Sequence, residues 1–164
     1  MRTDDAAEPL ARLFGELTDG VTSGSGFVLN TGDIGLLRSL QTLAAGEASR
    51  SVNEGATIAA HAQHVRYGLS LMNQWAVAGG NPFANAKWDE AWKVSIVTDA
   101  EWTEIRDGLR DEVHRWLEVL RTPREAEPVA FTGMLASVAH LAYPLGAIRQ
   151  IAKSTRGPKE GTFS

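Results

Sequence analysis

The histidines are the residues of this sequence best suited to chemistry. His61 and His64 are three residues apart in a stretch predicted to be helical, so both side chains can lie on broadly the same face of one helix. His140 lies in a second such stretch, and histidines from two neighbouring helices can meet inside a packed protein. Neutral imidazole binds zinc, nickel and iron, which makes a metal site one hypothesis. A pair of core histidines satisfied by carbonyl groups or water is the other, and spacing alone favours it.

Small residues accompany His140 on the same face of its expected helix. The stripe at helical spacing consists of Gly133, Ala136, His140, Pro144 and Ala147. Small side chains of this kind suit a crowded helix interface or the wall of a cavity. The fourth histidine, His114, lies off the apolar stripe of its own helix and among charged neighbours, so it is predicted to be solvated.

Several common catalytic patterns are missing from the sequence. It contains no cysteine, which excludes a disulfide, a thiolate nucleophile and a Cys-ligated zinc, so any thiol would have to come from a second substrate. It contains neither a Gly-x-Ser-x-Gly elbow nor a His-Glu-x-x-His zinc motif. The glycine-rich residues 23–26 are followed by no Lys-Ser/Thr pair, so a flexible connection is favoured over a phosphate-binding loop.

Four long helices are expected to position these residues. They are predicted at about 9–18, 57–78, 98–122 and 127–156, with a long loop and a short extra helix between the first two. The third begins at a Thr-Asp-Ala-Glu capping box. Its apolar stripe consists of Trp102, Ile105, Leu109, Val113, Trp116 and Leu120. No alternating strand pattern appears, so an all-α, up-and-down four-helix bundle is the simplest architecture.

Pro144 is an unusual residue for the interior of the fourth helix. It lies four residues after His140 and has no N–H to donate to the His140 carbonyl. An interior proline costs about 3 kcal/mol or kinks the helix. We therefore expect the helix to bend near residues 140–144.

Composition limits the partners of the protein. A chain of 164 residues with 43% hydrophobic content has the core of one domain, assigned to residues 1–156, with residues 157–164 as a tail. The net charge of −4 and the scattered basic residues argue against nucleic acid as a partner. Residues 128–148 approach the length of a membrane span, but they are rich in small residues, and a helix buried in a bundle is favoured over a membrane helix. The acidic N-terminal segment lacks the apolar region of a secretory signal, which predicts a cytoplasmic protein.

Five tryptophans are many for this length, and two of them, Trp88 and Trp92, lie in the connection before the third helix. They are candidates to line a ligand pocket beside the histidines. A role in the core or in capping the end of the bundle is favoured, because large rings more often serve that purpose.

Two segments resemble a known family. "TIAAHAQHV" and "AHLAYPLGAIRQ" are similar to the corresponding segments of the DinB-like superfamily of damage-inducible four-helix bundles, which includes bacillithiol and mycothiol S-transferases. The second segment is the more specific, and the resemblance spans nearly the whole chain. It implies a four-helix bundle with an extra short helix between the first and second helices, and a homodimer.

The resemblance also implies a metal site, with one divalent ion held by three histidines. His64 and His140 match two of these positions, and the third falls on Pro144, which cannot bind metal. One hypothesis is a degenerate site in a protein that binds a small molecule inside the bundle. The alternative is a metal-dependent thiol transferase in which His61 replaces the missing ligand, so that His61, His64 and His140 hold nickel, zinc or iron. The degenerate site is favoured.

Overall fold

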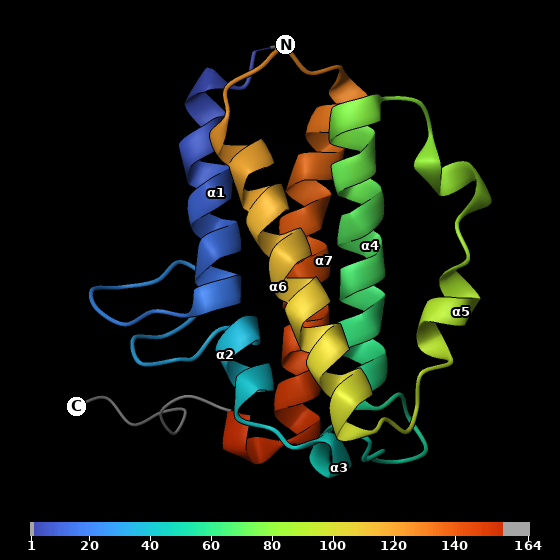
Figure 1. The fold of residues 1–164 in the computed structure, drawn as a ribbon. Coiled ribbons are helices and arrows are strands. Elements are labelled where there is room, and N and C mark those ends of the chain that lie inside the picture. Colours follow the sequence, from blue (N-terminus) through green and yellow to red (C-terminus); the bar gives the residue numbers. More distant parts are fainter. Residues whose placement is uncertain (1, 156–164) are drawn as a thin grey trace.

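The computed structural model describes residues 2–155, and this part of the chain is all-α (Figure 1). The four long helices are α1 (Asp4–Asp19), α4 (Ile58–Ala78), α6 (Asp99–Arg121) and α7 (Pro128–Ile151). The short helices are α2 (Leu36–Gln41), α3 (Ala45–Ala48), η1 (Pro82–Asn85), α5 (Trp88–Trp92) and η2 (Lys153–Thr155). Residues 2–155 contain no β-strand, which confirms the predicted all-α class.

The four long helices pack around one apolar core. α6 contacts α1 and α4, and α7 contacts the same two helices (Figure 1). All six apolar residues predicted for the stripe of the third helix are buried, as expected. The two core tryptophans of α6 also satisfy their indole N–H groups, because Trp102 donates to the Leu43 carbonyl at 2.8 Å and Trp116 donates to Ser137 Oγ at 2.9 Å.

Capping residues fix both ends of α4 and the start of α6. Thr57 Oγ1 accepts the Ala60 N–H at 3.1 Å and so begins α4, within one residue of the predicted start. At the start of α6, Glu101 Oε2 accepts the Thr98 N–H at 2.8 Å while Thr98 Oγ1 accepts the Glu101 N–H at 3.3 Å, which confirms the capping box. α4 ends at Ala78 and is followed by Gly79, whose φ of 67° lies in the left-handed region that glycine adopts readily.

Two predicted helix ends are wrong. α1 begins at Asp4, so Pro9 lies inside the helix and does not start it. The carbonyl that lacks a donor because of Pro9 belongs to the exposed residue Asp5, where water can reach it. α7 ends at Ile151 and is followed by the η2 turn, five residues before the predicted end. Arg156 and the tail at 157–164 lie outside the described residues.

α7 continues as a helix through Pro144, which is buried. The predicted bend at residues 140–144 stays a prediction.

The long connection between α1 and α2 is non-helical, as predicted, and it is anchored at two points. Burial of the Glu16 carboxyl group raises its pKa, but hydrogen bonds from three backbone N–H groups and the nearby Arg12 outweigh burial, so the pKa is lowered. The three bonds run from residues 27, 28 and 29 at 2.9, 2.6 and 2.5 Å. Further along the connection, Arg149 of α7 donates to the Ile34 carbonyl at 2.8 Å and pairs with Asp33 at 3.4 Å. The part of the connection that follows residues 23–26 is therefore held to α1 and α7, and the flexibility predicted for residues 23–26 stays a prediction.

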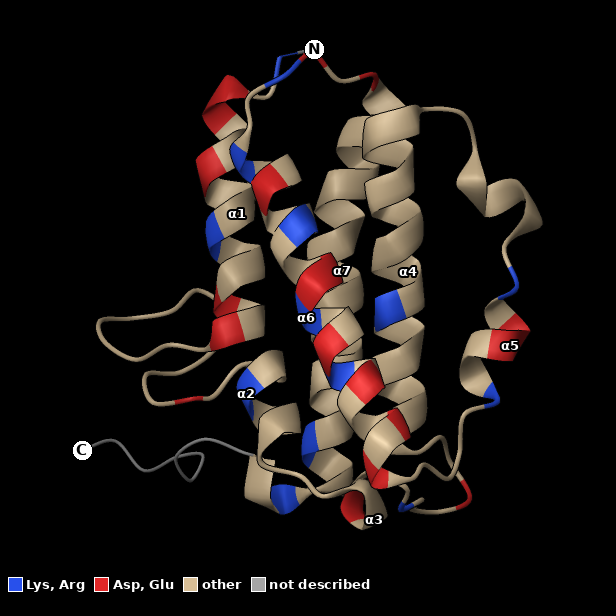
Figure 2. Ribbon diagram, viewed as in Figure 1, with Lys and Arg blue, Asp and Glu red and all other residues tan. Residues whose placement is uncertain are grey.

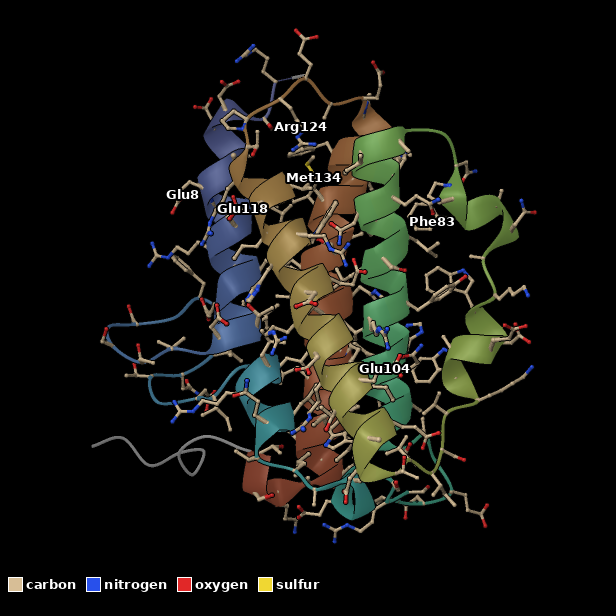
Figure 3. The ribbon with its side chains drawn as sticks, viewed as in Figure 1. Glu8, Phe83, Glu104, Glu118, Arg124 and Met134 are labelled. Atoms are coloured by element: carbon tan, nitrogen blue, oxygen red, sulfur yellow. The ribbon has the colours of Figure 1, made fainter. Side chains whose placement is uncertain are left out.

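A second contact joins the start of the chain to the α6–α7 connection. The Thr3 N–H donates to the Arg124 carbonyl at 3.0 Å, and the Arg124 N–H donates to Thr3 Oγ1 at 3.0 Å. Thr3 is 2% exposed, and Arg2 forms an isolated antiparallel bridge with Glu125. We call residues 2–3 and 124–125 the terminal clasp. Figure 3 shows Arg124 at the end of the molecule where the chain begins.

The outer side of α7 is apolar and exposed. Charged residues mark α1 and α6 along their lengths, whereas α7 is uncharged until Arg149 (Figure 2). Val129, Leu135 and Tyr143 are 67%, 50% and 70% exposed. Within residues 2–155, α7 is the one helix long and apolar enough to span a membrane, and 33% of its most apolar stretch is buried. The prediction that burial accounts for this apolar run is therefore correct for only one side of the helix.

Candidate functional site

His64 of α4 and His140 of α7 meet across the helix interface. Their Nε2 atoms are 2.9 Å apart, and the two rings are nearly perpendicular, with an interplanar angle of 86°. This confirms the prediction that the two side chains face each other. His64 is buried, whereas His140 is exposed over part of its surface, so the pair lies at the edge of the interior and not at its centre.

The contact between the two Nε2 atoms requires one ring to donate its N–H and the other to accept. The surroundings of His64 indicate which ring is the donor. His64 Nδ1 is buried and has no hydrogen-bond partner. A buried N–H without an acceptor is rarer in proteins than an unused acceptor, so the proton of neutral His64 is assigned to Nε2. His64 then donates to His140 Nε2, and the proton of neutral His140 is on its Nδ1.

Two tryptophans of α5 cover the histidine pair. The Trp92 ring stacks on His64 with centroids 4.1 Å apart and an angle of 22°, and Trp88 lies 5.6 Å from the same ring. The segment that carries them, residues 79–93, is called the strap. It leaves α4 through two glycines with positive φ, Gly79 and Gly80, and its Lys87 N–H donates to Tyr67 Oη at 2.9 Å. Side chains fill the space between the strap and α4 (Figure 3).

The favoured role of these two tryptophans as core or cap residues is therefore wrong. They lie on the side of the packed helices, against the histidines. The spacing of Trp88 and Trp92, at i and i+4, indicated that both rings lie on one side of a short helix. It did not indicate which long helix the strap packs against.

The environment keeps the histidines neutral. Burial is the largest effect on His64, and the charges of His140 and His61 add to it, which together lower its pKa to about 4. Burial also lowers the pKa of His61 and, through the covered side of its ring, that of His140. Neutral imidazoles are both hydrogen-bonding groups and competent metal ligands.

A pocket of about 160 Å³ adjoins the histidine pair, between α4, α7 and the strap. Its walls come from Val65, Gly68, Leu69, Met72, Phe83, Trp88, Gly133, Ala136, Ser137, His140 and Leu141. Three residues of the predicted small-residue stripe, Gly133, Ala136 and His140, are among them, as expected of a cavity wall. Gly68 keeps the pocket open, because a Cβ atom there would lie 3.6 Å from both His140 Cε1 and Trp88 Cζ3.

His61 is not among the residues that line this pocket. Its ring is 5.2 Å from Trp92 and 6.5 Å from Tyr143, both in edge-on contact, and its buried Nδ1 has no partner. Among residues 2–155, no group of three or more His, Asp or Glu side chains is placed to hold a metal ion. The side chains as arranged here therefore do not fit a three-ligand centre of His61, His64 and His140, and we derive no step through a metal. His114 is exposed on α6, as predicted.

Sequence reasoning missed most of the pocket. Val65, Leu69 and Met72 of α4 read as ordinary core residues, and Phe83 lies in a segment without periodicity. Tyr67 accepts the hydrogen bond that holds the strap. It lies three residues after His64, and this helical spacing could have placed it on the same face of α4.

Comparisons with protein-family models, with curated proteins and with solved structures found no match to this chain.

Proposed function

We propose that this chain is a DinB-like, up-and-down four-helix bundle with a degenerate histidine site, and that it binds a small molecule in the adjoining pocket. The observation that carries the proposal is the contact of 2.9 Å between His64 and His140 at the wall of an apolar pocket. Two histidines that match the family register lie together, while the third position is Pro144. One hydrogen bond joins the two Nε2 atoms, so both of these nitrogens have a partner without a metal ion.

The runner-up proposal is a metal-dependent thiol transferase that uses His61, His64 and His140. The unpartnered Nδ1 atoms of His61 and His64 favour it, because a buried nitrogen without a partner is available to a ligand. The size of the pocket opposes it. Ligand sites for drug-sized molecules measure about 300–1,000 Å³. A space of about 160 Å³ holds only the end of a low-molecular-weight thiol conjugate.

The test combines metal analysis with ligand titration. Protein purified without added metal salts is examined by elemental analysis, and its amide NMR spectrum is recorded with a broad set of small charged and uncharged molecules. We expect less than one tenth of an equivalent of nickel, zinc or iron, and ligand-induced shifts at Gly68 and Ser137. Equimolar metal would support the transferase.

Two glycine variants locate the binding. Gly68→Ala places a methyl group between His140 and Trp88, whereas Gly146→Ala makes the same change on α7 where a Cβ atom meets nothing within 4 Å. Binding weakened at least fivefold by the first change and unchanged by the second is the expected result. If no molecule in the set binds in a manner sensitive to Gly68→Ala, the proposal fails.

A homodimer in the cytoplasm completes the proposal. The uncharged outer side of α7 supports the dimer, because a second copy would meet no like charge there. Sedimentation velocity measures the association state, and Leu135→Glu, at a position 50% exposed, should shift a dimer towards monomer.

A further inference from the structure

The size of the pocket restricts what it can hold. A cavity of about 150 Å³ lined by Leu, Ile and Phe side chains takes up benzene. The pocket beside His140 measures about 160 Å³ and is lined mainly by apolar side chains. One six-membered ring therefore fills it, and only part of a nucleotide, a fused polycyclic compound or a peptide would fit inside.

The walls exclude charge. No Asp, Glu, Lys or Arg is among the lining residues. An ion that entered would lose water and meet no opposite charge, which disfavours its binding. An uncharged molecule does not carry this cost.

The walls also favour an aromatic molecule. Phe83 of η1 and Trp88 of α5 present rings from the strap side, and Met72 presents a thioether from α4. Contacts between aromatic rings are favourable beyond the area they bury, and sulfur contacts with rings are favourable as well. An aliphatic ring of the same size lacks these contacts.

Polar groups at the walls are few. Ser137 Oγ is already used twice, since it accepts from Trp116 Nε1 at 2.9 Å and donates to the Met134 carbonyl at 2.7 Å. His140 is the other lining side chain on α7 with hydrogen-bonding atoms, and it is partly exposed at the edge of the pocket. Its Nε2 already pairs with His64, so its Nδ1–H is the group left for a ligand. A ligand with its apolar ring inside would thus place a polar substituent near His140.

We propose that the pocket between α4, α7 and the strap takes an uncharged, single-ring aromatic molecule with one hydrogen-bonding substituent, of which phenol is the simplest example. This inference rests on the proposed function and specifies its ligand class. His140 hydrogen-bonds the substituent, Trp88 and Phe83 contact the ring, and Gly68 provides the space.

The experiment compares matched probes by NMR titration of the full chain at pH 7.5. Phenol is compared with benzoate and benzylamine, which add a negative or a positive charge, with cyclohexanol, which removes the aromatic ring, and with 1-naphthol, which adds a second ring. We expect phenol to bind at least tenfold more tightly than either charged probe, and more tightly than cyclohexanol or 1-naphthol.

Ala136→Leu and Ala139→Leu are the paired variants. Both are exposed alanines of α7, but only Ala136 lines the pocket. Ala136→Leu should weaken phenol binding at least tenfold and Ala139→Leu should leave it unchanged, with both amide spectra confirming an intact fold. His140→Phe, which removes the hydrogen bond while keeping a ring, should weaken phenol at least threefold.

The outcomes separate this inference from the function on which it rests. If benzoate, benzylamine or 1-naphthol binds as tightly as phenol and is sensitive to Ala136→Leu, the ligand class is wrong while the small-molecule pocket stands. If no probe of any class is sensitive to Ala136→Leu, the pocket binds none of them and the proposed function fails together with the inference.

Discussion

Acid should destabilise this protein before its carboxylates begin to titrate, and His64 should be a main cause. The pKa of His64 is lowered from 6.5 to about 4 in the folded chain, first by burial and then by the charges of His140 and His61. The unfolded chain therefore binds a proton between these values that the folded chain does not. The sign follows from linkage: the free energy of unfolding is highest above pH 6.5 and falls as pH drops towards 4.

The magnitude follows from the same two pKa values. One pKa unit corresponds to about 1.4 kcal/mol, so a shift from 6.5 to about 4 is worth about 3 kcal/mol once both states are protonated. At pH 5 the unfolded histidine is almost fully protonated and the folded one is not, which gives a loss of about 2 kcal/mol relative to pH 8. His61 and His140, whose pKa values are also lowered by burial, add to the loss in the same direction.

Urea unfolding between pH 8 and pH 5, with a chelator present to remove metal, measures this loss. The His64→Gln variant should lose about 2 kcal/mol less than the natural protein over this range. His114→Gln, which changes an exposed histidine of α6, serves as the matched control and should keep the full pH dependence. Parallel curves for the natural protein and His64→Gln, or a natural protein that becomes more stable from pH 7 to pH 5, would refute the assignment of His64 as a buried neutral histidine.

Three further changes test separate parts of the structure. Pro144→His should raise the affinity for Ni²⁺ or Zn²⁺ in calorimetric titration, because it places an i, i+4 histidine pair on α7 beside His64. Equal affinity in the two proteins would contradict the degenerate site. So would tight binding by the natural protein that His61→Ala abolishes. Glu16→Gln should cost about 2 kcal/mol in urea unfolding and speed amide exchange at residues 27–29, because three N–H groups lose a carboxylate acceptor; unchanged exchange would count against this anchor. Ser137→Ala should cost about 1–3 kcal/mol, because the buried Trp116 N–H loses its acceptor; an effect below about 0.5 kcal/mol would show that water replaces the hydroxyl.

Local signals made α4 and α6 predictable. Three signals act within a few residues and so do not depend on the rest of the fold. They are the Thr-x-x-Glu capping box, the glycines after Ala78 and the apolar period of α6. The meeting of His64 and His140 was predictable for a related reason. Each lies on the inward stripe of its own helix, and two inward stripes must face each other when the helices pack.

Features that depend on tertiary placement were not predictable. The strap has no hydrophobic period, so its position over α4 is decided by contacts of Trp88, Trp92 and Tyr67 that form only in the folded chain. The exposure of one side of α7 was not predictable either, although this helix is rich in apolar residues. A helix that is apolar all round carries no marker of which side faces outward, and here one side remains uncovered in this chain.

The terminal clasp has a consequence for the order of events during synthesis. Thr3 and Arg124 are separated by 121 residues, so at about 5–20 residues per second the ribosome needs about 6–24 s after making Thr3 before its partner exists. Throughout that interval the Thr3 hydroxyl, which makes no capping bond to its own helix, has no partner in the clasp. The first turn of α1 should therefore be among the last parts of the described chain to become ordered, although it is synthesised before the other helices. A nascent chain arrested before residue 124 should remain open to proteases at its N-terminus, and closure there would mark the arrival of the α6–α7 connection.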